Sequence, residues 1–301
     1  MGTDKRERQK AGRQVRLDEA RAAQKAAARR RRIFSALVVV ALVVGIGLVI
    51  SLLSGDDDQS VTSDDTTDST DSTDTTAPEE SAIPEPPGAG ASITGETPCP
   101  PADGSAERTT SFEQLPPTCI DPDASYTATF ATSAGDVTVA LDTEQTPVTT
   151  NNFVVLARYH YYDDTALFRT DPSIDIIQGG APTTNDNSDP GAGYDLPDEG
   201  GEFDFSDPAA PTGPFTYEPG QLIMARSQGP DSSGSQFFFS TGPNVSNLDA
   251  QGTYLLFGEV TEGLEVLEEI LASHQADTTG RIPGGSPSPP VILESVTITE
   301  S

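Results

Sequence analysis

The side chains that most often carry out chemistry in enzymes are scarce in this sequence. Its 301 residues include two cysteines and two histidines, which are too few for most zinc and iron–sulfur sites. The sequence contains neither a phosphate-binding P-loop nor a His-Glu zinc motif. The run Asp186-Asn187-Ser188-Asp189 could bind a cation, but a solvated loop is the favoured interpretation. We therefore expect neither a metal nor a cofactor.

The two cysteines could provide a nucleophile or form a disulfide. A thiol nucleophile needs a base beside it, and the two histidines, His160 and His274, are far from Cys99 and Cys119 in the sequence. Two thiols in an oxidising compartment usually pair, and closing a loop of this length contributes about 3 kcal/mol. We predict a disulfide between Cys99 and Cys119, with a catalytic thiol as the alternative.

Charge divides the chain into two unlike parts. Residues 1–32 hold 12 of the 17 basic residues and four of the 47 acidic residues. After residue 53 the chain has no lysine, the other 43 acidic residues, and five arginines at positions 108, 158, 169, 226 and 281. The net charge of −30 disfavours a general nucleic-acid binder, which needs a basic face. We expect the basic tail to set membrane topology and to bind anionic lipid, with nucleic-acid binding as the alternative.

Residues 33–53 separate these two parts. They form a run of 21 residues without a charge, and about 20 apolar residues span the hydrocarbon core of a bilayer. A cleaved signal peptide would have a shorter apolar region, of about 7–15 residues, and a buried core helix is the other alternative. Four arginines at 29–32 flank the run, so the positive-inside rule places the N-terminus in the cytoplasm and residues 54–301 outside. We predict a retained single-pass transmembrane helix.

The exported part begins with a low-complexity stretch. Residues 54–91 are rich in Asp, Ser, Thr and Pro and have few apolar side chains, so burial cannot offset the entropy of ordering them. We predict an acidic, disordered linker over 54–91, a Cys-flanked neck over 92–123 and a folded domain over 124–301.

The folded domain has the sequence pattern of a mainly β protein. Residues 126–142 alternate apolar and polar side chains about a Ser-Ala-Gly-Asp turn, which predicts a hairpin. Two helices are expected at 146–158 and 262–271. Further strands are expected at 174–177, 222–226, 236–241, 254–260 and 290–300. About eight short strands and two helices predict a closed, eight-stranded antiparallel barrel capped by two helices.

Five short blocks of this domain occur in a distinctive order. They are Asp163-Asp164-Thr165-Ala166-Leu167-Phe168-Arg169, Ile177-Gln178-Gly179-Gly180, Leu222-Ile223-Met224-Ala225-Arg226, Gly234-Ser235-Gln236-Phe237-Phe238-Phe239 and Leu255-Leu256-Phe257-Gly258. In this order and spacing the blocks resemble the cyclophilin peptidyl-prolyl isomerases over about residues 124–300. The layout of tail, anchor, linker and neck resembles an exported, membrane-anchored member of the actinobacterial type.

The resemblance also implies the residues of the active site and the cyclophilin barrel that holds them. It implies catalytic roles for Arg169, Gln178 and Gln236. It implies substrate binding by Phe168, Ile176, Met224, Ala225, Arg226, Phe238, Leu248 and Tyr254.

These residue types suit rotation about an X–Pro bond, which has a barrier of about 18–20 kcal/mol and breaks no covalent bond. In the twisted transition state the proline nitrogen becomes pyramidal and gains a lone pair. A fixed guanidinium at Arg169 would donate to that nitrogen only in the twisted state, and such differential binding accelerates a reaction. Phe238 would form the floor of a pocket for the proline ring. Without the resemblance, a surface ion pair would be the favoured interpretation of Arg169.

The sequence departs from the family pattern at several positions. One extra residue lies between the catalytic arginine and the first glutamine. Asp175 occupies the position of a usual pocket Phe, and we expect Ile174 to turn inward in its place. Arg226 replaces a usual Asn, and Asn247 lies where many members have Trp. We therefore expect a binding groove that is less apolar and more charged than usual.

These observations together predict a membrane-anchored prolyl isomerase that assists the folding of exported proteins, with its catalytic domain outside the membrane. The expected partners are proline-containing segments of exported polypeptides and the membrane, through residues 33–53. We expect a monomer that does not bind nucleic acid. The alternative is a cyclophilin-like prolyl-peptide-binding module or chaperone with little catalysis, which Asp175 and Asn247 favour.

Overall fold

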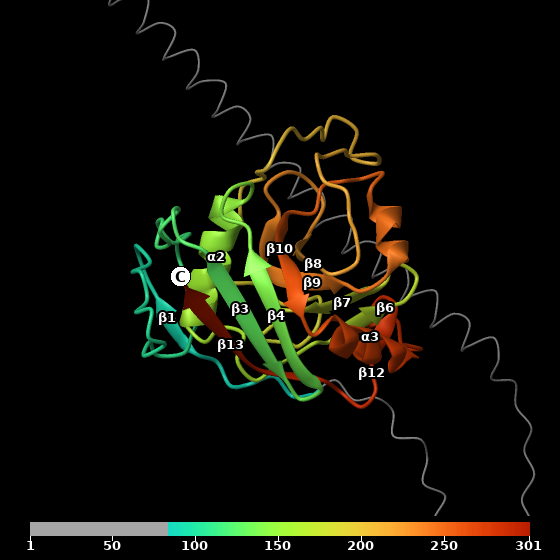
Figure 1. Cartoon of the computed structure of the whole chain (residues 1–301), viewed down its shortest axis with the longest axis horizontal. Coiled ribbons are helices and arrows are strands. Elements are labelled where there is room, and N and C mark those ends of the chain that lie inside the picture. Colours follow the sequence, from blue (N-terminus) through green and yellow to red (C-terminus); the bar gives the residue numbers. More distant parts are fainter. Residues whose placement is uncertain (1–83) are drawn as a thin grey trace, which may run out of the picture. The chain divides into compact units, whose positions relative to one another are not determined.

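The computed structural model describes residues 84–301 (Figure 1). The predicted basic tail, the predicted transmembrane helix at 33–53 and most of the predicted linker lie outside the described residues. Between residues 84 and 301, none of the helices has both the length and the apolar composition needed to cross a bilayer.

The folded domain is built on one curled antiparallel sheet with the strand order β11-β12-β6-β7-β9-β8-β10-β4-β3-β13-β5 (Figure 1). The strands expected from the sequence pattern are present as β3 (Tyr126–Thr132), β4 (Gly135–Leu141), β7 (Ile176–Gly179), β8 (Gln221–Arg226), β9 (Ser233–Ser240), β10 (Leu256–Glu262) and β13 (Ile292–Glu300). Four further strands are β5 (Thr165–Ala166), β6 (Arg169–Asp171), β11 (His274–Ala276) and β12 (Gly285–Pro287).

The predicted mainly β, antiparallel architecture is confirmed, but the predicted closed eight-stranded barrel is wrong. Within residues 84–301 the sheet has 11 strands, and its outermost strands, β11 and β5, each pair with one neighbour. The extra strands are two or three residues long. A strand this short cannot show the alternation of apolar and polar side chains that identifies a strand in a sequence.

Two α-helices pack with the sheet, as predicted for this part of the chain. They are α2 (Pro147–Arg158) and α3 (Leu264–Ala272), and a 3₁₀ helix, η1, covers Pro243–Leu248. Phe153 on α2 packs against Phe130 of β3 and Phe237 of β9, with ring centroids 5.7 and 6.0 Å apart. These rings form the centre of the core, which fixes α2 on one face of the sheet.

The N-terminus of α2 is capped from a distance. Thr146, at the N-cap position, makes no side-chain hydrogen bond to the first turn. The carboxylate of Glu199 instead accepts hydrogen bonds from the backbone N–H groups of Val148 (3.1 Å) and Thr149 (2.6 Å). A carboxylate at this end also complements the positive end of the helix dipole.

The neck packs beside α2 (Figure 1). It also contains the predicted disulfide. Its strands β1 (Ala91–Ile93) and β2 (Thr109–Phe112) form a small parallel sheet. The Cys99–Cys119 bond is present, with Cα atoms 5.4 Å apart, so the predicted pairing is confirmed. The side-chain oxygen of Asn151 on α2 accepts a hydrogen bond from the backbone N–H of Cys119 at 2.6 Å. The neck is therefore bonded directly to the main helix of the domain.

The chain before the neck also contacts the domain. Residues 84–91 belong to the stretch that the sequence assigns to the linker. The backbone N–H of Gly90 donates to Oγ1 of Thr110 (3.0 Å), and the side-chain amide of Asn185 donates to the carbonyl of Pro84 (3.1 Å). These contacts place the last residues of that stretch against the folded part.

Candidate functional site

Three adjacent strands place the predicted catalytic residues on one face of the sheet. Arg169 of β6 pairs with Gln178 of β7, and Gln178 pairs with Phe238 of β9. Residues directly opposite each other on paired strands share a face, and side chains alternate between faces along a strand. Arg169, Gln178, Gln236 and Phe238 therefore point to the same side, while Phe237 and Phe239 point into the core.

Three acceptors hold the guanidinium of Arg169. Its Nε donates to the carbonyl of Pro283 (2.7 Å), its Nη1 to Oε1 of Gln178 (2.9 Å) and its Nη2 to Oδ2 of Asp171 (2.8 Å). A guanidinium has about five N–H donors, so one N–H on each Nη atom is left after these bonds. The group is thus fixed in position and keeps donor capacity for a further acceptor.

Asp171 is the charged partner of this arginine. Burial alone would raise the pKa of the Asp171 carboxyl, but hydrogen bonds from Ser173 and Arg169 lower it below its ordinary value. Asp171 therefore stays ionised at neutral pH, and the ion pair with Arg169 is permanent under those conditions.

The hydrogen-bond chain continues from Arg169 to the second glutamine. The amide nitrogen of Gln178 donates to Oε1 of Gln236 at 2.8 Å. The first contact uses the oxygen of Gln178 and the second its nitrogen, so the chain fixes the orientation of both amides. The predicted catalytic trio is therefore one connected unit in the structure.

An aromatic pocket lies beside this unit. Phe238 is 2% exposed, and its ring meets the ring of Tyr254 edge to face with centroids 5.6 Å apart. Tyr217 holds Tyr254 in place: the Tyr217 hydroxyl accepts from the backbone N–H of Tyr254 (2.8 Å) and donates to its carbonyl (3.0 Å). Burial raises the pKa of the Tyr254 phenol, so this pocket residue is neutral at physiological pH.

A cavity of about 460 Å³ joins the two features. Nine of the predicted site residues line it, namely Arg169, Ile176, Gln178, Ala225, Arg226, Gln236, Phe238, Leu248 and Tyr254. The structure thus brings together all three predicted catalytic residues and most of the predicted binding residues.

Two predicted binding residues, Phe168 and Met224, lie in the core instead. Phe168 precedes Arg169 by one position and so takes the opposite face, where it packs in a small cluster with Ala166, Ala181 and Ile282. Met224 pairs with Phe237 and shares its core face, fully buried. The register shift that follows Met224 on β8 then brings Ala225 and Arg226 to the cavity.

Asp175 departs from the family pattern, and it and its neighbour Ile174 take different positions relative to the cavity. Ile174 lines the cavity, as expected from the sequence. Asp175 has a left-handed backbone (φ 48°), and its carboxylate accepts a hydrogen bond from the backbone N–H of Asn244 at 2.8 Å. The carboxylate of Asp175 is therefore engaged with η1, and an apolar side chain faces the cavity in its place. Asn247 donates to the carbonyl of Ser173 (3.4 Å) and leaves Leu248 to line the cavity.

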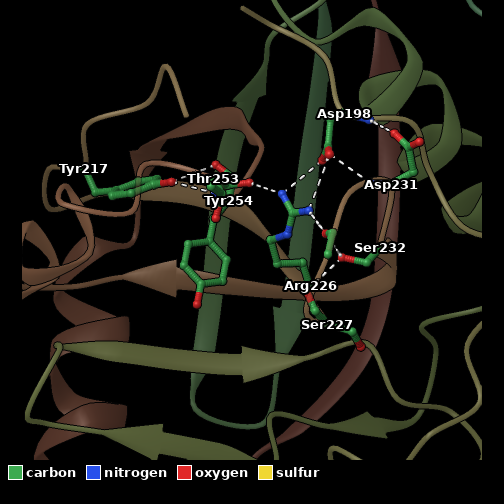
Figure 2. A network of polar contacts seen from close by, with 9 residues as sticks. Asp198, Tyr217, Arg226, Ser227, Asp231, Ser232, Thr253 and Tyr254 are labelled. Carbon is green, nitrogen blue, oxygen red and sulfur yellow. Dashed lines mark hydrogen bonds and ion pairs between the residues drawn. The ribbon is translucent and has the colours of Figure 1, made fainter. Parts of the chain in front are cut away.

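Arg226 is held by a dense network at the edge of the cavity (Figure 2). Its side chain is 4% exposed and forms an ion pair with Asp198, with Nη1 and Oδ1 2.9 Å apart. Its Nη1 also donates to the carbonyl of Thr253 (2.6 Å), and its guanidinium lies 4.8 Å from the ring centroid of Phe205. Arg226, the last residue of β8, thus ties the end of this strand to Thr253, the neighbour of Tyr254, and positions the pocket wall.

Several residues of the site were not predicted from the sequence. Asp171, two positions after Arg169, could have been recognised from its spacing, because side chains two apart on a strand share a face. Pro283 gives no such signal, since it acts through its backbone and lies 114 positions from Arg169. A further part of the cavity wall comes from loops and is largely polar; it includes Asn187, Asp189, Gly191, Tyr194, Asp195, Ser227 and Ser232.

The site combines a pocket for an apolar ring with a fixed guanidinium. The pocket beside Phe238 suits a small apolar ring, and the remaining donors of Arg169 lie on the same face of the sheet. A fixed cation can stabilise a lone pair that develops on a bound nitrogen without reorganising when it does so. This arrangement needs no covalent intermediate.

Comparisons with known proteins identify one family. Residues 127–298 match the family model described as cyclophilin type peptidyl-prolyl cis-trans isomerase/CLD. Over 153 residues the chain is 36% identical to peptidyl-prolyl cis-trans isomerase CYP18-2 of Arabidopsis thaliana, an alignment that covers 51% of this chain and 84% of that protein. Over 193 residues it is 32% identical to peptidyl-prolyl cis-trans isomerase A of Mycobacterium tuberculosis, covering 59% of this chain and 94% of that protein.

Other relatives are much longer. The chain is 30% identical over 175 residues to peptidyl-prolyl cis-trans isomerase-like 2 of Cryptococcus neoformans, covering 58% of this chain but 27% of the length of that relative.

A crystal structure of a cyclophilin type isomerase from Cryptosporidium parvum aligns at 26% identity with a TM-score of 0.45, covering 59% of this chain and 99% of that one. The family model covers more than half of this chain, so the chain belongs to the cyclophilin-type peptidyl-prolyl cis-trans isomerase family.

Proposed function

We propose that this protein catalyses cis-trans isomerisation of X–Pro bonds in exported polypeptides and thereby assists their folding. The observation that carries the catalytic part is the Arg169–Gln178–Gln236 chain beside the pocket of Phe238 and Tyr254. The proline ring sits in this pocket while the preceding carbonyl rotates. Arg169 donates to the proline nitrogen when amide resonance is lost, and so lowers the barrier of about 18–20 kcal/mol.

The proposed location is the outer face of a membrane, with residues 33–53 as the anchor and the N-terminus in the cytoplasm. The 21-residue uncharged run and its four flanking arginines support this orientation. The Cys99–Cys119 disulfide also supports it, because disulfides persist mainly in oxidising compartments. The resemblance of the layout to exported actinobacterial members points the same way. Proline-containing segments of exported polypeptides are the proposed substrates.

Two measurements test the location. N-terminal sequencing of the protein from the membrane fraction should find residues ahead of 33, and protease added outside intact cells should reach the folded domain. Mature protein that begins after residue 53 would exclude the retained anchor, and a domain protected in intact cells but cleaved after lysis would exclude the orientation.

A second candidate is a prolyl-peptide-binding module with little catalysis. The Asp171 carboxylate, 2.8 Å from Nη2 of Arg169, favours it, because a fixed negative partner weakens the pull of the guanidinium on a developing lone pair. Exchange NMR on an Ala-Pro peptide separates the two candidates. Faster exchange with protein present supports the enzyme, while binding without faster exchange supports the module.

A further inference from the structure

One wall of the cavity is a loop outside the sheet. Residues 189–195 supply Asp189, Pro190, Gly191, Tyr194 and Asp195 to the lining. The loop is fixed at both ends. The carboxylate of Asp189 accepts from the backbone N–H of Thr183 (2.7 Å), and the backbone N–H of Leu196 donates to the carbonyl of Ser233 (2.7 Å). The middle of the loop, residues 192–194, needs support from elsewhere.

The neck supplies that support through Phe112, the last residue of β2. The backbone N–H of Phe112 donates to the carbonyl of Ala192 at 2.8 Å. The Phe112 ring, 2% exposed, packs edge to face against Tyr194 and Tyr159, with centroids 6.4 and 5.4 Å apart. A Cβ added at Gly193, which has φ +113°, would overlap the carbonyl oxygen of Phe112. Neck and loop are therefore in direct backbone contact.

Tyr194 is held from a second side by α2. Its hydroxyl donates to Oδ1 of Asn152 at 2.6 Å, and the amide of Asn152 donates to the carbonyl of Gly234 at 3.2 Å. Gly234 itself lines the cavity. Tyr194 thus lies between the ring of Phe112 and the amide of Asn152, and its position depends on both.

The neck is rigid enough to act as a support. Cys99 and Cys119 are covalently joined, and Asn151 of α2 bonds the neck on both sides of Cys119: it accepts from the backbone N–H groups of Cys119 and Ile120 and donates to the carbonyl of Pro117. Phe112 lies between the two cysteines in the sequence. It also lies outside residues 127–298, which match the family model.

From these contacts we infer that Phe112 is a positioning residue for substrate binding, so that the neck completes the peptide-binding cavity of the family domain. Phe112 holds Tyr194 and the loop 189–195, which form one wall of the cavity that Arg169 also lines. The inference rests on the proposed isomerase activity. In this inference the neck supports the cavity wall that binds the residues on either side of the proline, while the pocket of Phe238 binds the proline itself.

The test compares two substrates on the full-length protein. Exchange NMR measures KM and kcat for an eight-residue peptide with a central Ala-Pro bond and for the dipeptide Ala-Pro. With Phe112→Ala, KM for the long peptide should rise about tenfold while kcat changes less than about twofold, which is the signature of lost binding rather than lost chemistry. The dipeptide, which fills only the proline pocket, should change less than about threefold in kcat/KM.

A matched control comes from the same neck. Leu115 packs against the core, and the structure records no hydrogen bond or ring contact between Leu115 and the loop. Leu115→Ala should leave the preference for the long peptide unchanged. If Phe112→Ala does not fold, Phe112→Leu decides, because it keeps apolar volume and loses the aromatic contact with Tyr194; a selective rise in KM for the long peptide is again the expected result.

Three outcomes would overturn the inference. One is an unchanged KM for the long peptide in a folded Phe112 variant. Another is an equal loss on both substrates, which would show a general structural role. The third is an equal selective effect of Leu115→Ala. A wild type that binds both peptides without speeding exchange would instead reject the proposed function, so the two failures are distinguishable.

Discussion

Phe238 and Phe239 are neighbours on β9 that face opposite sides of the sheet. Substitutions at the two positions should therefore differ in their effects on peptide affinity and on the free energy of unfolding. Phe238 lines the cavity and has one recorded ring contact among the described residues, with Tyr254. Phe239 faces the core and packs against Phe130 and Phe237, with ring centroids 5.0 and 5.7 Å apart. Replacing each by Ala removes the same atoms from two different environments.

The expected magnitudes follow from these environments. Truncating a buried Phe to Ala typically lowers the free energy of unfolding by about 3–5 kcal/mol. Phe239→Ala should lie at the upper end, because it leaves a closed cavity and removes two aromatic contacts worth about 0.5–1.5 kcal/mol each. Phe238→Ala should lie at the lower end, about 3 kcal/mol, because the buried ring of Phe238 borders a cavity, so its loss enlarges an existing space instead of creating a closed one. A domain with the usual stability of about 5–15 kcal/mol should tolerate at least the smaller loss.

Binding should show the opposite order. Phe238→Ala removes the floor of the pocket, so the Kd of an Ala-Pro peptide should rise at least about tenfold, equivalent to about 1.4 kcal/mol. Phe239→Ala should change the Kd less than about twofold. Urea unfolding gives the stability of each variant, and NMR titration gives the Kd. A Phe238→Ala protein that is folded and binds the peptide like wild type would refute the assignment of this pocket.

Other features of the site and surface give further predictions. Asp171→Ala frees Nη2 of Arg169, so kcat in exchange NMR should fall about tenfold with little change in KM; a rise in kcat would show that the carboxylate damps the guanidinium instead of positioning it. Burial alone would lower the pKa of His160, but its contacts with the carbonyl of Gly104 (2.9 Å) and the carboxylate of Asp163 (2.7 Å) both require a donated proton and raise it. The stabilisation that protonated His160 contributes should therefore be complete below its unfolded pKa of about 6.5 and be lost as the pH rises through its higher folded pKa. The substitution His160→Ala should then lower the free energy of unfolding more at about pH 5.5 than at about pH 9. An equal loss at both pH values would contradict this prediction. Because the chain has 43 acidic residues and five arginines after residue 53, added salt should raise the Tm by screening repulsion, and a Tm that falls with salt would count against this expectation.

The parts of the site that could be predicted from the sequence are those encoded in short blocks. Arg169, Gln178, Gln236 and Phe238 come from three such blocks, and strand pairing places them on one face. The position of Ile174 could be predicted because Asp175, at the position of a usual pocket Phe, is polar, and Ile174 is its apolar neighbour.

The parts that could not be predicted depend on contacts between distant segments or on the face a residue takes. Pro283 reaches Arg169 through a backbone carbonyl, and Glu199 caps a helix about 50 positions away, so neither role depends on a recognisable local pattern. Phe168 and Met224 belong to the predicted blocks, but strand alternation and the register shift on β8 turn them into the core. Phe112 lies in a neck that the sequence identifies only by its cysteines, and its contact with Tyr194 appears only in the folded chain.

The most direct test of the proposed mechanism is exchange NMR on an Ala-Pro peptide with wild type and Arg169→Ala. In the proposed mechanism Arg169 donates to the proline nitrogen only in the twisted state, so the variant should lose about 10²–10³-fold in kcat while its Kd for the peptide changes less than about threefold. The Asp171, Gln178 and Pro283 contacts of Arg169 lie at the edge of the cavity, so the fold should be retained. A wild type that accelerates exchange together with an Arg169→Ala protein of equal kcat would contradict the mechanism.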